Sequence, residues 1–237
     1  MIKINENTKL VVLTGAGISA ESGLKTFRDS DGLWENYPVT DVATPEAYQR
    51  NPAMVWRFYK ERWKQARQAH PNPGHEALAR LETWLGQNFS LITQNVDGLH
   101  TRAGNSRVIE MHGSLENALC LSCNSRSPMD SINLDPDIPA CPKCGASLRP
   151  DIVWFGEMPY RMQEIDALLQ ACDVFMVVGT SGVVYPAAGF VMTASYLGAK
   201  TLAVNLEAGE MPHFVDEFHQ GKAGEVLPRI VENWMEA

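Results

Sequence analysis

The sequence lacks the features that would take the chain into a membrane or onto a nucleic acid. Its apolar runs fall well short of the roughly 20 residues that cross a bilayer, and its first residues show no small-residue cleavage site, so we expect no signal peptide. Its 28 acidic residues outnumber 20 basic ones, which argues against the basic face of a nucleic-acid-binding protein. We therefore expect a cytoplasmic globular protein that binds basic protein segments, with no nucleic-acid or membrane partner.

Cysteines are few, and four of the five form two closely spaced pairs. Cys120 and Cys123 make one C-x-x-C pair, and Cys141 and Cys144 make the other, with 17 residues between the pairs. This spacing is typical of a structural zinc ribbon, in which four thiolates fill a tetrahedral shell and leave no open position for chemistry. Two disulfides or free thiols are the alternative, which a cytosolic location makes less favourable. Cys172 stands apart, and we predict a buried, inert thiol.

Apolar strands alternate with helices along most of the chain, a pattern that predicts an α/β fold with a doubly wound, parallel, Rossmann-like sheet. We expect strands at 10–13, 89–93, 108–111, 174–178 and 201–204. We expect helices that begin at Asn51-Pro52 and Asn72-Pro73, and further helices at 159–172, 186–198 and 225–235. The predicted dinucleotide-binding domain comprises 1–30, 75–113 and 157–237. A helical insertion occupies 31–74, and the proline- and cysteine-rich segment 114–156 is a smaller zinc module.

The first strand runs directly into a glycine-rich turn. Gly15, Ala16 and Gly17 follow the apolar run Leu10–Leu13, and glycines at the end of a buried strand allow a sharp turn and a close approach to a ligand. A helix beginning there would face its free N–H groups toward a diphosphate. The third glycine of G-x-G-x-x-G is replaced by Ala20, so an ordinary strand-to-helix turn is the alternative.

Polar or glycine residues follow five of the expected strands, where parallel strands end at one edge of the sheet. They are Gly15, Gln94, His112, Gly179 and Asn205. His112 is the candidate general base, because an imidazole titrates near neutral pH; the alternative is a hydrogen-bonded structural histidine. Asn95 and Asp97 are candidates for the same crevice, although they could instead cap the backbone of their loop.

Together these motifs resemble the sirtuins, the NAD-dependent protein-lysine deacylases. The resemblance covers residues from about 9 to 231, and the motifs occur in the same order as in that family. It includes GAGIS and AESG at 15–23, TFRD at 26–29, QNVDGLH at 94–100, His112-Gly113, the four cysteines, VWFGE at 153–157, GTS at 179–181 and NLE at 205–207. Lys25-Thr26 departs from the Pro-Asp that many members carry before Phe-Arg.

The resemblance implies a reaction and a set of site residues. The acyl-lysine carbonyl would attack the nicotinamide ribose of NAD, with His112 as general base on the ribose hydroxyls and with Asn95 and Asp97 as further catalytic residues. Nicotinamide, free lysine and O-acyl-ADP-ribose would be the products. The implied NAD-binding residues are Gly15, Ala16, Gly17, Ala20, Thr26, Phe27, Arg28, Trp34, Gln94, Asn95, Asp97, Gly179, Thr180, Ser181, Asn205, Glu207 and Ala223. The peptide would add as a strand between 182–184 and the segment that includes Val153, Phe155 and Gly156.

A subclass of sirtuins removes succinyl, malonyl or glutaryl groups, and Ala43, Tyr59 and Arg62 resemble its acyl pocket. The small Ala43 would leave room for a longer chain, while Tyr59 and Arg62, three apart on one helix face, would bind its carboxylate. Alternatively, Tyr59 packs in the core and Arg62 is a solvated helix charge.

On the basis of the resemblance to this acyl pocket, we predict desuccinylation and demalonylation with some deacetylation. The rivals are a sirtuin that is mainly a deacetylase, a mono-ADP-ribosyltransferase and a non-catalytic NAD sensor. The sequence shows no coiled coil and sets no oligomeric state.

Overall fold

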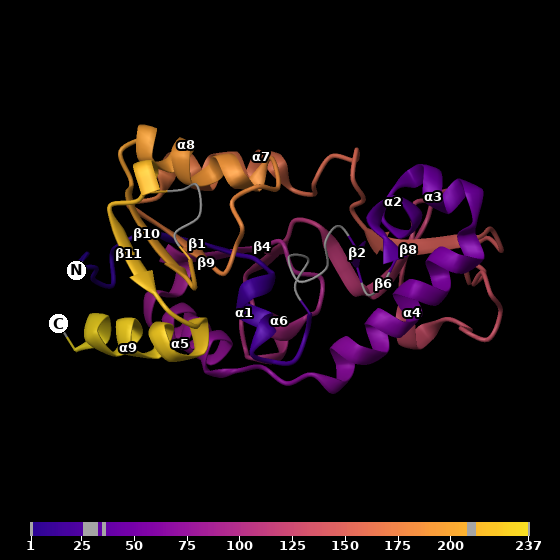
Figure 1. Cartoon of the computed structure of the whole chain (residues 1–237), viewed down its shortest axis with the longest axis horizontal. Coiled ribbons are helices and arrows are strands. Elements are labelled where there is room, and N and C mark those ends of the chain that lie inside the picture. Colours follow the sequence, from indigo (N-terminus) through magenta and orange to yellow (C-terminus); the bar gives the residue numbers. More distant parts are fainter. Residues whose placement is uncertain (1, 26–32, 35–36, 208–211, 237) are drawn as a thin grey trace.

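A six-stranded parallel sheet forms the centre of the larger part of the molecule (Figure 1). The computed structural model describes residues 2–25, 33–34, 37–207 and 212–236, with only the backbone at 33–34 and 212. The strands of this sheet, in spatial order, are β11 (Glu217–Gln220), β10 (Lys200–Asn205), β9 (Val174–Val178), β1 (Leu10–Thr14), β4 (Phe89–Thr93) and β5 (Val108–Glu110). The order reverses between β9 and β1, as in a doubly wound dinucleotide-binding sheet. The predicted fold class is confirmed.

Helices cover both faces of this sheet. Leu10 and Val12 of β1 pack against α5 (Pro73–Leu85) and α9 (Ala223–Met235), whereas Val11 and Leu13 pack against α7 (Met162–Ala171) and α8 (Phe190–Tyr196). Figure 1 shows α7 and α8 above the sheet and α5 and α9 below it. Both faces of β1 are therefore buried, which explains why its sequence is apolar without alternation. The short helices α1 (Ala16–Ala20) and α6 (Leu99–Arg102) follow β1 and β4.

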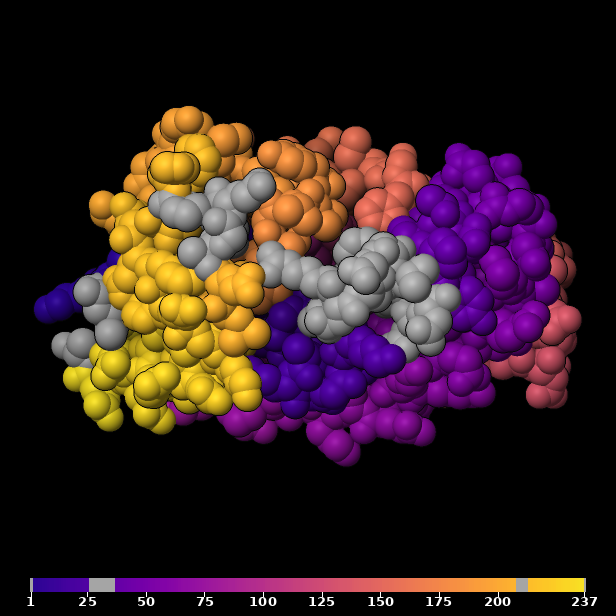
Figure 2. Space-filling view, in the orientation of Figure 1, coloured from indigo at the N-terminus to yellow at the C-terminus, as the bar shows by residue number. Residues whose placement is uncertain are grey.

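A smaller, three-stranded antiparallel sheet lies beside the large one. It consists of β7 (Arg126–Pro128), β6 (Gly113–Cys120) and β8 (Leu148–Ile152), in that order. It packs against α4 (Pro52–Gln68), to which α2 (Val39–Val42) and α3 (Pro45–Arg50) are joined. A two-stranded ribbon, β2 (Leu33–Trp34) and β3 (Tyr37–Pro38), precedes α2. Figure 2 shows the purple segment that contains α2–α4 as a lobe on the right, opposite the yellow and orange segments of the larger part.

Some helices begin where predicted, and others begin at a different residue. α4 and α5 begin where expected, because the side chains of Asn51 and Asn72 each accept a backbone N–H in the first turn. In contrast, α8 begins at Phe190 rather than Pro186, after the 3₁₀ turn Ala187–Gly189, and α7 begins only at Met162. Within the described part of the chain, the other 3₁₀ turns are Gly86–Asn88, Met129–Ser131 and Pro212–Phe214. The edge strand β11 was not predicted. No helix among the described residues is long and apolar enough to span a membrane.

The turn between β1 and α1 lies against the loop that follows β9, at the point where the strand order reverses. The Gly17 N–H donates to the Gly179 carbonyl oxygen at 2.7 Å. A Cβ on Gly17 would lie 2.7 Å from that oxygen and 2.8 Å from the Gly179 Cα. Gly179 itself has φ +59°. In the structure, these glycines are required by the contact between two loops of the protein. The sequence had instead predicted glycines that allow close approach to a ligand.

Gly17→Ala should destabilise the protein by about 1–3 kcal/mol, because the new methyl group would overlap backbone atoms that cannot rotate away. The measurement is the free energy of unfolding in urea. Gly189→Ala is the matched control, since its Cβ would lie 3.7 Å from the nearest heavy atom, a ring carbon of Tyr185. Equal unfolding free energies for the two variants would contradict the loop contact.

Candidate active site

A cavity of about 630 Å³ lies at the carboxyl edge of the parallel sheet and extends to the small sheet and α4. Its wall includes a residue from each of the five loops that the sequence predicted to converge: Gly15, Gln94, His112, Gly179 and Asn205. These residues lie at or just beyond the ends of β1, β4, β5, β9 and β10, which are neighbouring parallel strands. Parallel pairing brings their ends to one edge, so the prediction that the five loops meet is confirmed.

Most of the predicted site residues line this cavity. They are Gly15, Ala16, Gly17, Ala20, Ala43, Tyr59, Arg62, Gln94, Asn95, Asp97, His112, Val153, Phe155, Gly156, Gly179, Thr180, Ser181, Asn205 and Ala223. Glu207 is exposed and does not line the cavity. Thr26, Phe27, Arg28 and the Trp34 side chain lie outside the described residues.

A buried polar cluster connects the first glycine turn with the loop after β4. The Asn95 side-chain amide donates to the Gly15 carbonyl oxygen at 3.0 Å and to the Ser19 Oγ at 3.1 Å, and Ser19 Oγ donates to the Asp97 carboxylate at 2.7 Å. Asp97 also accepts the Leu99 N–H at 2.9 Å, so it caps its own loop as the alternative proposed. Burial raises the pKa of Asp97, while the Leu99 N–H, Ser19 and two arginines oppose that shift. Capping the loop and lining the cavity are compatible roles for Asp97.

The hydrogen bond of His112 determines which ring nitrogen carries its proton. His112 Nδ1 lies 3.1 Å from the Gln94 carbonyl oxygen. A carbonyl oxygen only accepts, so Nδ1 is the donor and Nε2 of the neutral ring carries a lone pair. Burial lowers the pKa of His112 below its usual value, and the bond to Gln94 offsets part of this shift. His112 is therefore neutral at pH 7, the state that a general base requires.

A second set of polar contacts joins the ends of β4, β9 and β10. The Gln94 side-chain amide donates to Thr180 Oγ1 at 3.0 Å, and the Asn205 amide donates to the Thr180 carbonyl oxygen at 2.9 Å. Gly221 donates its N–H to the Asn205 carbonyl oxygen at 3.0 Å and precedes Lys222, the residue before α9. Gly221 and Lys222 both line the cavity, although only Ala223 of this segment was predicted. A glycine two residues before a helix was the available signal.

The wall formed by α4 and the segment after β8 carries a buried cation. Ala43 and Tyr59 are 3% and 1% exposed, and Arg62 is only 8% exposed, so the alternative of a solvated Arg62 is wrong. The Ala43 carbonyl oxygen accepts the Phe155 N–H at 3.0 Å. The Tyr59 hydroxyl oxygen accepts the Trp154 indole N–H at 3.0 Å. Trp154 lines the cavity, but the sequence analysis did not select it from its motif.

The four paired cysteines form one cluster at the far end of the small sheet. Their sulfur atoms all lie within 4.8 Å of one another. The Cys120–Cys144 and Cys123–Cys141 sulfur pairs are 3.5 and 3.7 Å apart. Tetrahedral zinc with bonds of about 2.3 Å requires ligand sulfurs about 3.8 Å apart, so the arrangement fits zinc with four thiolates. Cys172 is half-buried, and burial raises its pKa to about 11, which keeps the thiol protonated at neutral pH.

Comparison with known proteins agrees with this geometry. The model of the Sir2 family matches residues 15–186. The chain is 49% identical over 234 residues to an NAD-dependent protein deacylase of Pasteurella multocida, covering 98% of this chain and 100% of the relative. It is 51% identical over 224 residues to NAD-dependent protein deacylase 2 of Pyrobaculum aerophilum, covering 94% and 89%.

Solved structures give the same result. A crystal structure of a Sir2 homologue–NAD complex superposes with a TM-score of 0.88 at 40% identity, covering 98% of this chain and 91% of that one. A Sir2–p53 peptide–NAD⁺ structure superposes with a TM-score of 0.83 at 32% identity, covering 96% and 94%. The glycine turn, the five converging loops, the four-cysteine cluster and the extent of these matches together show that the chain belongs to the Sir2 family, the sirtuins.

Proposed function

We propose that the chain is an NAD-dependent protein-lysine deacylase that removes succinyl and malonyl groups and, less efficiently, acetyl groups. The family and the deacylase names of relatives about 50% identical support the reaction class. The buried guanidinium of Arg62 in the cavity wall is the observation that carries the acyl preference. A succinyl or malonyl group carries a terminal carboxylate that could pair with this guanidinium, whereas an acetyl group carries none.

The residues that line the cavity support NAD binding. The glycine turn and the Gly179 loop would hold the diphosphate, and Thr180, Ser181, Asn205 and Ala223 would hold the adenosine half. Gln94, Asn95 and Asp97 would line the side of the nicotinamide ribose. Bound NAD supplies an electrophilic ribose carbon once nicotinamide leaves, and the acyl-lysine carbonyl oxygen is the nucleophile. The resemblance further implies that Phe27 shields that carbon after nicotinamide leaves and that Arg28 helps to order the loop.

His112 would accept a ribose hydroxyl proton at Nε2. Its Nδ1–H stays bonded to the Gln94 carbonyl oxygen, which fixes the ring and stabilises the charged imidazolium that forms when the proton arrives. The products would be free lysine, nicotinamide and O-acyl-ADP-ribose.

The acyl pocket would use three residues of the lobe that contains α2–α4. Ala43 offers only a methyl group and leaves room for a chain longer than acetyl. Arg62 would pair with the terminal carboxylate through charge-assisted hydrogen bonds, and Tyr59 would add a hydroxyl. A cation held at 8% exposure interacts with an anion more strongly than a solvated one, because little water screens the pair.

The acylated peptide would lie between the two lobes as an added strand, along Val153, Phe155 and Gly156 and the stretch 182–184. The N–H groups of Val153 and Phe155 already donate to carbonyl oxygens of His112 and Ala43. The peptide would therefore donate its own N–H groups chiefly to the carbonyl oxygens of this segment. Recognition through the main chain reads little of the substrate sequence, which suits an enzyme that acts on many proteins.

We assign zinc a structural role, with 114–156 as its module, 31–74 as the helical insertion and the remainder as the NAD-binding domain. The cavity wall contains none of the four cysteines. A cytoplasmic location would agree with this role, because thiols stay reduced there and remain available as zinc ligands.

The test of acyl preference compares one peptide carrying succinyl-lysine or acetyl-lysine, each with NAD. We expect the kcat/KM ratio of succinyl to acetyl to exceed one, and Arg62→Met to lower that ratio about 10- to 150-fold through loss of a hydrogen bond to a charged group. A ratio below one in the wild type would make the enzyme mainly a deacetylase. Binding of NAD without turnover of either peptide would favour a non-catalytic NAD sensor. Turnover of NAD in the absence of an acylated peptide would favour a mono-ADP-ribosyltransferase.

His112→Tyr should abolish turnover of every acyl-lysine while NAD still binds, because no other group in the cavity is assigned to take the ribose proton. In the wild type, the acid limb of kcat/KM should have its midpoint below pH 6.5, since burial lowers the pKa of His112 and the ring loses its lone pair only below that pKa. Turnover by the variant would show that another residue is the general base. So would an acid limb of the wild-type kcat/KM profile with its midpoint at or above pH 6.5.

Zinc removal should unfold the small sheet before the large one. The apolar cluster beside the cysteines is small, and Cys120 and Cys141 are two of its six buried members. We expect about one zinc per chain, and a chelator or Cys123→Ser should abolish hydrogen-exchange protection of β6 and β8. Cys172→Ser is the matched control and should keep both zinc and protection. Full protection in the metal-free protein would contradict a structural role.

A further inference from the structure

The segment 153–157, which is proposed to meet the peptide, forms a tight turn just after β8. Every residue of this segment lines the cavity. The Glu157 N–H donates to the Trp154 carbonyl oxygen at 2.9 Å, and Gly156, between them, has φ +91°. The Glu157 carboxylate in turn accepts the Trp154 N–H at 2.8 Å. Both main-chain polar groups of Trp154 are therefore bonded within the turn, one of them by a side chain.

Arg149 of β8 holds the Glu157 side chain in place. Its guanidinium forms a fork with the Glu157 carboxylate, with N–O distances of 2.6 and 2.8 Å. The same guanidinium donates to the Ile152 carbonyl oxygen at 2.7 Å and lies over the Trp154 ring, 3.5 Å from its centroid. Arg149 thus connects the last residue of β8 with both ends of the turn.

The environment of this ion pair keeps it closed. Arg149 is 6% exposed, and the Glu157 side chain is 28% exposed. Burial alone would raise the pKa of Glu157, but Arg149 and the Trp154 N–H outweigh burial and lower it below its usual value, so the carboxylate is ionised at neutral pH. A planar fork resists rotation of either side chain. The turn is therefore held in one conformation before any substrate arrives.

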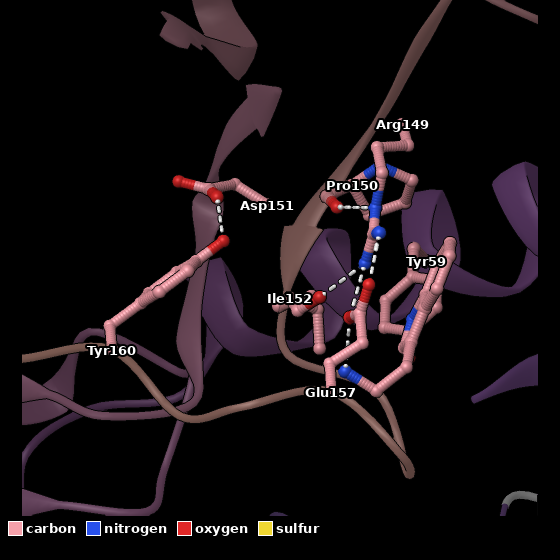
Figure 3. Close-up of polar contacts among 8 residues, drawn as sticks. Tyr59, Arg149, Pro150, Asp151, Ile152, Glu157 and Tyr160 are labelled. Atoms are coloured by element: carbon pink, nitrogen blue, oxygen red, sulfur yellow. Dashed lines mark hydrogen bonds and ion pairs between the residues drawn. The ribbon is translucent and has the colours of Figure 1, made fainter. Parts of the chain in front are cut away.

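The chain beyond the turn has a separate attachment. The Tyr160 hydroxyl donates to the Asp151 carboxylate at 2.8 Å, and the Tyr160 N–H donates to the Met111 carbonyl oxygen at 2.9 Å. Figure 3 shows the two attachments, Arg149 with Glu157 on the right and Asp151 with Tyr160 on the left. Loss of the ion pair should therefore loosen the turn without detaching the chain that follows it.

We propose that Arg149 and Glu157 are positioning residues for the acylated peptide, because their ion pair holds the turn 154–157 in the conformation with which the peptide pairs. The peptide then binds an edge that is already ordered, and the entropic cost of ordering that edge does not weaken binding. The pair acts on the main chain of the segment, so its effect should be equal for every acyl group. The inference rests on the proposed addition of the peptide as a strand and adds what prepares its partner.

The test measures the peptide KM, at saturating NAD, of Arg149→Lys, Glu157→Gln and the double variant. Lysine keeps the charge but cannot form the fork. Each single variant should raise KM about 5- to 30-fold for succinyl-lysine and acetyl-lysine alike, as expected if about one backbone residue has to be ordered on binding. The NAD KM should stay unchanged. The double variant should lose no more than the weaker-binding single variant, because the two residues act as one unit.

Hydrogen exchange at the residue 157 N–H gives a readout that does not depend on turnover. In the wild type, this amide should be protected both with and without an acetyl-lysine peptide, in the absence of NAD. In Arg149→Lys, its protection should be lost in the free protein and restored by the peptide, while β6 and β8 stay protected. Glu157→Gln serves the same purpose if Arg149→Lys fails to fold. Loss of protection throughout β6 and β8 would overturn the proposal, since the pair would then only stabilise the small sheet.

Glu164→Gln is the matched control. Arg161 and Glu164 form the same kind of fork, with two N–O distances of 2.6 Å, but both side chains are half-exposed and lie outside the cavity wall. This variant should leave the peptide KM at the wild-type value. A rise equal to that of Glu157→Gln would show that any lost ion pair has this effect, and would contradict a positioning role.

An N-methylated peptide distinguishes failure of the positioning role from failure of the proposed binding mode. Methyl groups on the amide nitrogens beside the acyl-lysine remove N–H groups that carbonyl oxygens of the segment would accept. If N-methylation raises the wild-type KM but Arg149→Lys and Glu157→Gln do not change it, the positioning role alone is wrong. If N-methylation leaves the wild-type KM unchanged, strand addition is wrong and the positioning role falls with it.

Discussion

The contact between two backbone turns, one after β1 and one after β9, is the constraint on which the site depends. These strands are neighbours at the point where the strand order reverses, so their loops leave the sheet side by side. The 2.7 Å bond from the Gly17 N–H to the Gly179 carbonyl oxygen leaves no room for a side chain on either glycine. The same two loops form part of the cavity wall. A glycine-rich sequence at this place therefore serves the protein's own packing as well as any bound diphosphate.

Buried charge and directed hydrogen bonds give the rest of the cavity its chemical character. His112 is kept neutral by burial, and its tautomer is set by one carbonyl oxygen. Arg62 is buried in the opposite wall, where it is 8% exposed. The two groups come from different lobes, one from the end of β5 and the other from α4. The cavity thus combines an imidazole at the end of the parallel sheet with a buried arginine on the smaller lobe.

Local patterns in the chain predicted the fold well where the reason for an element was local. Apolar runs marked β1, β4 and β9, because both faces of each strand are covered. Asn-Pro pairs marked the starts of α4 and α5, because the asparagine side chain satisfies a free N–H and proline suits the first turn. The edge strand β11, Glu217–Gln220, alternates weakly in exposure and carries mixed side chains, so its pairing with β10 had no local signal.

The sequence by itself determined the family resemblance, the order of the parallel strands' loops and the zinc-type cysteine spacing, since each follows from residue type and separation along the chain. Only the tertiary structure decided the state of individual side chains. Arg62 could have been a solvated helix charge, and its burial depends on the packing of α4 against a segment about 90 residues later. The same packing brings Trp154 to Tyr59. Hydrogen-bond direction and desolvation depend on neighbours that are distant in sequence, and no spacing along the chain encodes them.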